Sequence, residues 1–128
     1  MSPEGGAANA ARTPERALRE VSLEHLERSK LVVLGLATRD PLETSSADWA
    51  YERSLAGTLL ADTRLYRLAA QDSGVSDVAR VMRDLETVLL EASLSDNSDR
   101  EALGRVQRLI SKRDLVVKMQ LMAGSAGL

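Results

Sequence analysis

Three polar side chains, His25, Ser29 and Asp62, come nearest in type and spacing to a catalytic arrangement. His25 and Ser29 are four residues apart, so a helix would place both on one face. A serine nucleophile needs an adjacent base and an acid that orients the base, and Asp62 on a second helix is the candidate acid. Because no nucleophile-elbow glycine pattern or oxyanion loop accompanies the pair, we favour a structural histidine instead. We expect His25 to be buried and hydrogen-bonded to another helix, through Asp62 or Tyr66.

The chain offers few ligands for a metal or a cofactor. It has no cysteine and one histidine, which excludes thiolate metal sites, disulfides and cysteine nucleophiles. A carboxylate-bridged metal site in a helical bundle uses a Glu-x-x-His motif, but Ser22 stands three residues before His25. A haem with two histidine ligands would need two copies of the chain. The sequence therefore predicts no metal, no cofactor and no enzymatic activity.

A second set of polar residues lies on the segments predicted to face His25. Asp62 and Tyr66 are one helical turn apart, and Asp84 and Glu86 belong to the next predicted helix. Such groups could shape a ligand pocket, but more often they form a network that specifies which helices meet. We assign them, together with His25 and Ser29, to a polar core.

Composition narrows the class of protein. The formal net charge of the 128 residues is −2, which argues against a domain that binds nucleic acid. The longest apolar run, residues 31–37, is far shorter than the roughly 20 residues of a membrane span. Aromatic residues are scarce, and a core of Leu, Val, Ala and Met suits the packing of helices on helices. No segment of this chain is expected to span a membrane or to be a signal peptide.

The pattern along the chain predicts an all-α protein, an up-down antiparallel four-helix bundle over residues 13–122. Residues 1–12 are predicted to be a flexible linker and residues 123–128 a disordered tail. The first three helices are predicted at 13–38, at 48–72 and from 76 to about 93, followed by a turn at 94–98. The fourth is predicted from Ser98, where Ser98 and Glu101 match a capping box. Gly74 is expected to end the second helix. After Asp114 the pattern weakens, and we favour a continued helix over a short strand.

Apolar residues at helical spacing give the expected core. Those predicted to be buried are Leu55, Leu59, Tyr66, Val78, Leu85 and Val106. The first helix adds an apolar face of Leu18, Val21, Leu26, Val32, Val33 and Leu36, and the fourth adds Leu103, Val106, Ile110 and Val117. Three polar residues, Ser22, His25 and Ser29, fall on the face of the first helix that points inward.

Further apolar residues lie off these stripes and form a candidate partner surface. They are Leu60, Leu65, Leu68, Leu115, Met119 and Met122. Single exposed leucines are ordinary, so the alternative is a surface without a function. If the residues form one surface, a symmetric dimer is the commonest arrangement that would cover it.

Four phrases of the sequence resemble a known family. They are EHLERS at 24–29, LVVL at 31–34, LLADTRLYR at 59–67 and DLETVLLE at 84–91. The chain from 17 to 122 resembles the helical C-terminal domain of bacterial zinc-finger anti-sigma-factor-like membrane proteins. The resemblance implies a regulatory or sensory domain on the extracytoplasmic side of the inner membrane. There it would receive a signal or a partner and act on transcription through a sigma factor held elsewhere in the protein.

The chain departs from that family at an important point. It lacks the His/Cys zinc motif of the sigma-binding part and also lacks the membrane span, so the resemblance implies an excised domain of a larger protein. Two other classes stay open. One is a small cytoplasmic helical adaptor or dimerisation module, and the other is a ligand- or cofactor-binding bundle.

Overall fold

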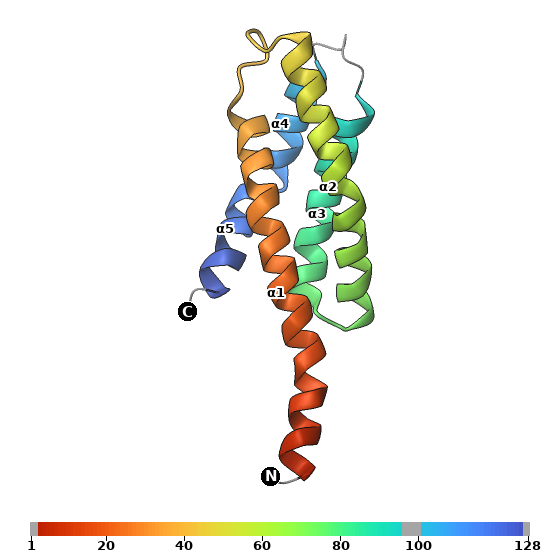
Figure 1. Cartoon of the computed structure of the whole chain (residues 1–128). Helices are drawn as coiled ribbons and strands as arrows, with labels where there is room; N and C mark the ends of the chain where they lie inside the picture. The colour runs from red at the N-terminus through yellow and green to blue at the C-terminus, as the bar shows by residue number, and fades with distance from the viewer. Residues whose placement is uncertain (1–2, 96–100, 127–128) are drawn as a thin grey trace.

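The computed structural model describes residues 3–95 and 101–126, with side chains over 14–95 and 101–122. The prediction of an all-α protein is confirmed over these residues (Figure 1). The chain forms five helices: α1 (Pro3–Thr38), α2 (Ser46–Asp72), α3 (Ser76–Leu94), α4 (Ala102–Lys112) and α5 (Leu115–Ala126). No helix in the described part of the chain is long and apolar enough to cross a membrane.

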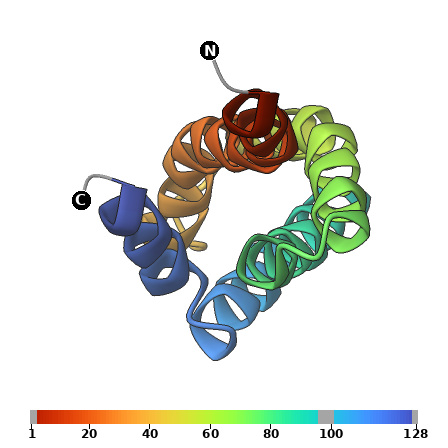
Figure 2. The same ribbon diagram turned by 90° about the horizontal axis from the view of Figure 1, so that it is seen from below.

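The helices follow one another round a ring in chain order, and α5 closes the ring beside α1 (Figure 2). The antiparallel pair α2 and α3 is by far the most extensively packed. The N-terminal turns of α1 project beyond the turn that joins α2 to α3 (Figure 1). Three long helices and two short ones make a compact helical domain that is not clearly a four-helix bundle.

Local sequence explains the two turns among the long helices. Asp40 Oδ1 accepts a hydrogen bond from the backbone N–H of Leu42 (2.9 Å), which turns the chain after α1. Ser45 then caps α2 by accepting from the N–H of Asp48 (3.1 Å). At the other end of α2, Gly74 has a φ of +71°, which confirms the predicted glycine stop.

The predicted fourth helix is wrong in one respect, because it breaks at Asp114. Asp114 has a φ of +51°, in the left-handed region that interrupts a right-handed helix. The segment beyond it is helical, as favoured over a strand, but it is a separate helix. Ser98 of the predicted capping box lies outside the described residues, and α4 begins at Ala102 without a side-chain cap.

The first and last helices extend beyond their predicted bounds. α1 begins at Pro3 and contains Pro14, although the sequence predicted a start at Thr13 after a linker. The alanine-rich stretch 7–11 has high helix propensity, which accounts for the longer helix. α5 continues to Ala126, into the segment predicted as a tail. Residues 1–2 and 127–128 lie outside the described residues, and the division into linker, domain and tail stays a prediction.

The core is centred on α3. Of the six residues predicted to be buried, Val78, Leu85 and Val106 are buried, as are most other apolar residues of α3. The remaining three, Leu55, Leu59 and Tyr66, are only half-buried. The buried residues of α2 are instead Trp49, Glu52, Ala56, Thr63 and Ala70. Three of these five, Ala56, Thr63 and Ala70, are small, and a Cβ at Gly57 would lie 3.9 Å from Ser93 Cβ on α3.

Two other residues assigned to the core are exposed. Val21 on α1 is 40% exposed, because it lies one residue round the helix from the inward-facing Ser22. Val117 on α5 is 53% exposed. Its assignment assumed an unbroken helix through Asp114, and the break there changes which residues of the last segment face the core.

Candidate functional site

A fully buried histidine lies between α1 and α2. Ser22, His25 and Ser29 occupy one face of α1 and have no solvent exposure, as their spacing predicts. His25 Nε2 is 2.6 Å from Thr63 Oγ1 on α2, and Ser29 Oγ is 3.3 Å from the same nitrogen. The ring of Tyr66 packs against the imidazole with 5.0 Å between the ring centroids. The prediction that His25 is buried and bonded to another helix is confirmed, but its partner is Thr63, not Asp62 or Tyr66.

The hydroxyl of Thr63 determines which imidazole nitrogen carries the proton. Thr63 Oγ1 donates its only hydrogen to the carbonyl of Leu59 (2.8 Å). It must therefore accept from His25, so the proton is on Nε2 of the neutral ring. His25 Nδ1 is left as a buried acceptor with no hydrogen-bond partner among the described residues. Ser22 Oγ is also buried and has no hydrogen-bond partner among the described residues.

Burial keeps His25 neutral. Removal from water lowers the pKa of His25, because the charged imidazolium loses its hydration. The positive charge of Arg28 lowers this pKa further, and the carboxylate of Asp62 opposes both effects. A neutral imidazole therefore links α1 to α2 through one short hydrogen bond.

The three residues considered as a triad are not assembled as one. His25 and Ser29 are within hydrogen-bond distance, but neither reaches solvent, where a substrate would have to enter. Asp62 lies on the exposed side of α2, one residue from Thr63, and does not contact His25 through a hydrogen bond. The geometry suits helix pairing and not nucleophilic attack.

Asp84 and Glu86 belong to two other contacts, so the predicted polar core is not one network. Asp84 on α3 is 8% exposed and accepts from Arg113 Nη1 and Lys118 Nζ, both at 2.7 Å. These two cations stand on either side of the α4–α5 break. Asp84 therefore fastens both short helices to α3.

Glu86 lies on the opposite side of α3 and faces α2. It accepts from Arg64 Nε (3.2 Å) and from Arg67 Nε. Burial is the largest single effect and raises the pKa of Glu86, but the hydrogen bonds and charges of Arg67 and Arg64 together hold this pKa below its usual value. This contact joins α2 to α3 at the surface.

Two polar contacts were not found from the sequence. The buried Glu52 on α2 pairs with Arg39 at the end of α1 (2.8 Å). Gln107 on α4 donates Nε2 to the carbonyls of Leu36 (2.9 Å) and Arg39 (2.7 Å). These carbonyls belong to the C-terminal end of α1 and have no partner within the helix. In the sequence, only the position of the charged Glu52 on an otherwise apolar stripe could have indicated its contact with Arg39. Nothing in the sequence indicated the contact made by Gln107.

The candidate partner surface is divided by the fold. Leu65 and Leu68 on α2 are 63% and 48% exposed, and Leu60 is half-buried. The assignment of Leu115 and Met119 to this surface is wrong, because both are buried in the core. After the break at Asp114 these two residues, four apart, turn inward. Met122 is half-buried and packs against the core.

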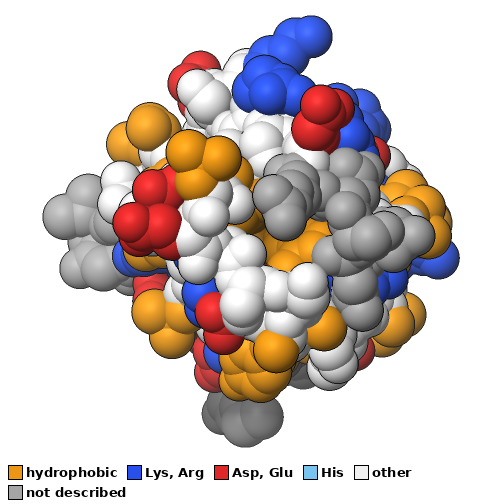
Figure 3. Space-filling model, turned by 90° about the horizontal axis from the view of Figure 1, so that it is seen from above, with side chains coloured by type: hydrophobic (Ala, Val, Ile, Leu, Met, Phe, Trp, Pro, Cys, Tyr) orange, Lys and Arg blue, Asp and Glu red, His pale blue; other side chains and the backbone are white. Residues whose placement is uncertain are grey.

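Exposed hydrophobic side chains are not confined to α2. The end of the molecule with the α1–α2 connection carries several hydrophobic groups, at its rim and at its centre (Figure 3). Leu42 in that connection is 95% exposed. Leu65 and Leu68 differ from Leu42 in lying together on one face of one helix.

The described residues contain no group of three or more His, Cys, Asp or Glu side chains placed to hold a metal ion. The comparisons with protein-family models, with curated proteins and with solved structures found no match for this chain.

Proposed function

We propose that this chain is a non-catalytic regulatory domain that acts through contact with a protein partner or with a second copy of itself. The observation that carries the proposal is the outward face of α2. Its residues recur at alternating spacings of three and four, and all of them are exposed: Tyr51, Ser54, Thr58, Ala61, Leu65 and Leu68. We call this face the α2 seam.

The α2 seam has the spacing of a coiled-coil surface without having a helix on it among the described residues. The N-terminal half of the seam is mostly small and polar, whereas Leu65 and Leu68 make its C-terminal half apolar. A second α2 seam or an amphipathic helix of a partner would remove both leucines from water, which favours association. The proposal of a homodimer rests on this face.

Light scattering after size exclusion tests the proposal over a range of protein concentrations. We expect the mass to rise with concentration, and we expect the double substitution Leu65→Lys and Leu68→Lys to abolish the rise. The control is Leu42→Lys, which adds a charge at a leucine that is more exposed and lies outside the α2 seam. A chain that stays monomeric throughout and captures no partner helix would contradict the proposal. Loss of association in the control variant would contradict the choice of surface.

The setting that we propose for this domain is an anti-sigma-factor-like membrane protein, on the extracytoplasmic side of a bacterial inner membrane. The resemblance over 17–122 supports it, and this range reaches from α1 into α5. There the domain would transmit a signal to a sigma-factor-binding domain. The alternatives are a cytoplasmic adaptor or dimerisation module and a ligand- or cofactor-binding bundle.

A paired experiment separates these roles. The chain alone should not retain a sigma factor in a pull-down, and deletion of residues 17–122 from the intact protein should alter signal-dependent release of the sigma factor. Tight binding of a sigma factor by this chain would overturn the assignment. If the gene encodes neither a zinc motif nor an apolar span upstream of this domain, the cytoplasmic adaptor is favoured.

We further propose that α4 and α5 together take the place of a fourth helix in an up-down bundle. Figure 1 supports this, because α5 continues along the chain direction of α4 while α1, α2 and α3 alternate. Asp84, bonded to residues on both sides of the break, is the contact that would hold the two segments in one position.

A further inference from the structure

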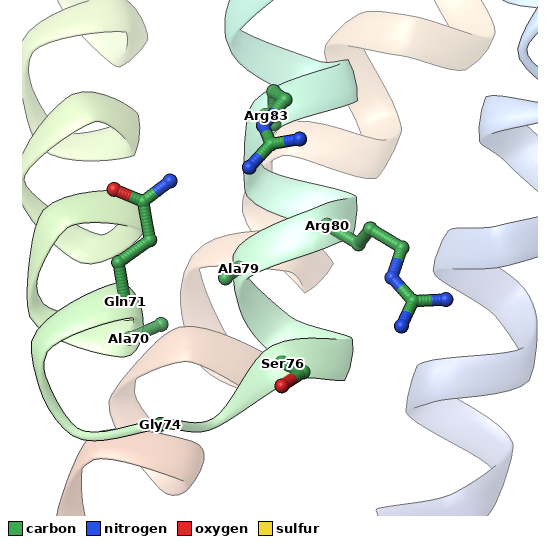
Figure 4. A pocket seen from close by; sticks show the side chains of 7 residues that line it. All are labelled: Ala70, Gln71, Gly74, Ser76, Ala79, Arg80 and Arg83. Atoms are coloured by element: carbon green, nitrogen blue, oxygen red, sulfur yellow. The ribbon is translucent and has the colours of Figure 1, made fainter.

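A pocket of about 340 Å³ lies where the C-terminal end of α2 meets the N-terminal end of α3 (Figure 4). Three of its lining residues are small: the buried Ala70 and Ala79, and the exposed Gly74 of the turn between the helices. Larger side chains at these positions would fill the space between the two helices. The volume is near the lower end of the range for pockets that bind small molecules, about 300–1,000 Å³.

The rim of this pocket is polar and basic. It consists of Gln71 from α2 and of Ser76, Arg80 and Arg83 from α3, and no acidic residue lines it. Gln71 and Arg83 both stand beside the groove between the helices (Figure 4). Arg80 lines the pocket with its stem while its guanidinium extends toward α5, and this exposed, flexible side chain can rotate over the opening. Neither arginine forms an ion pair with any residue that the structure describes.

Two of the neighbouring carboxylates, Asp77 and Glu86, are already paired, and the exposed Asp72 beside Gln71 does not line the pocket. Asp77 accepts from Arg19 Nη1 (2.9 Å), and this hydrogen bond holds the pKa of Asp77 below its usual value. Glu86 is shared by two arginines, Arg64 and Arg67, so the three side chains together have a net positive charge. The pocket is therefore a basic site on a chain whose formal net charge is −2.

We infer that this pocket binds a small molecule through a phosphate group. Two guanidinium groups balance the charge of a phosphate dianion and offer paired N–H donors that match its oxygens. Ser76 and Gln71 supply a hydroxyl and an amide at the rim. The C-terminus of α2 is the negative end of its helix dipole and the N-terminus of α3 is the positive end, so the two dipoles oppose each other at the pocket. The positive charge that would bind the phosphate therefore comes from the arginines. The inference does not depend on the proposed protein contact of the α2 seam.

Isothermal titration at constant ionic strength tests the site with two ligands, inorganic phosphate and glycerol 3-phosphate. Constant ionic strength matters because salt screens exposed charges. We expect saturable binding of at least one ligand, and Arg83→Gln should weaken it by about tenfold, the effect of one charge-assisted hydrogen bond. Arg80→Gln should weaken it in the same direction. The matched control is Arg108→Gln, an exposed arginine of α4, which should bind as the unchanged protein does.

The comparison of the two ligands identifies the source of the phosphate. Tighter binding of glycerol 3-phosphate assigns the pocket to a phosphorylated metabolite, and tighter binding of the inorganic ion assigns it to free phosphate. Circular dichroism should show that all three exposed substitutions leave the helical content unchanged. The absence of saturable binding of either ligand would overturn the inference. Equal weakening by Arg108→Gln would overturn it too, because the effect would then be one of net charge.

Discussion

Thr63 and His25 show how one hydroxyl can fix the state of a buried base. Because Thr63 gives its hydrogen to the carbonyl of Leu59, it can only accept from the imidazole, and the ring is held with its proton on Nε2. A protonated ring would need a second acceptor at Nδ1. The described residues offer none, so protonation would place an unpaired charge in the core.

The stability of the fold should therefore depend on pH through His25. Its pKa in the folded state lies below the ordinary value of 6.5 that applies to the unfolded chain. Below 6.5 the unfolded chain binds more protons than the folded one, so the free energy of unfolding falls as the pH decreases. Above 6.5 both states are neutral and this stability is fully present.

Urea unfolding of the protein and of His25→Gln, at neutral pH and near pH 5, measures this contribution. Glutamine keeps an N–H donor for Thr63 but does not titrate. We expect His25→Gln to be less stable at neutral pH because it loses the contact with Tyr66, and to lose less stability on acidification. An equal loss in both proteins would show that carboxylates alone cause the pH dependence, and that His25 does not titrate on folding.

The sequence predicted the inward face of α1 but not the partner of His25. Helical spacing alone places Ser22, His25 and Ser29 together. The partner depends on how α1 and α2 are rotated about their axes, and adjacent positions on a helix point about 100° apart. That rotation separates the buried Thr63 from the exposed Asp62, and no local pattern encodes it.

At the scale of the helices, the break at Asp114 is the feature with most effect. The apolar residues after Asp114 are arranged nearly all round the helix, so periodicity could not show a change of phase there. A residue with positive φ is usually glycine, and the sequence has aspartate. The single break explains three errors together: one helix too few, Leu115 and Met119 on the surface, and Val117 in the core.

Substitution of Asp114 by glycine and by alanine tests the break. In a continuous helix, alanine is more stable than glycine by about 1 kcal/mol. At a φ of +51° alanine is strained by about 1 kcal/mol and glycine is not, so we expect the order of stability to reverse. Thermal unfolding of the two variants gives the order directly. If Asp114→Ala is the more stable, residues 102–126 form one helix and the five-helix description fails.

Across the whole molecule, the helices differ in how extensively they pack against one another. The pair α2 and α3 is the most extensively packed, and α3 supplies much of the buried apolar surface. α4 and α5 are short, and isolated helices of their length are marginal in water, so they depend on contacts with the rest of the fold. Local opening should accordingly begin at the C-terminal end of the domain.

Asp84 should control that opening. Asp84→Asn removes the negative charge that holds Arg113 and Lys118 and should cost about 1.5–3 kcal/mol, a range typical of hydrogen bonds to charged groups. The matched control is Glu91→Gln, which removes a more exposed pair with Arg105 and should cost no more than about 1 kcal/mol.

Amide hydrogen exchange locates the effect within the molecule. In the unchanged protein we expect the slowest exchange in the centre of α3 and faster exchange in α5. In Asp84→Asn the amides of α4 and α5 should exchange faster still, while those of α2 and α3 change only by the loss in global stability. Uniform acceleration across all five helices would mean that the domain opens as one unit. α4 and α5 would then be an integral part of the fold, and Asp84 would stabilise the domain as a whole without fastening a separable segment.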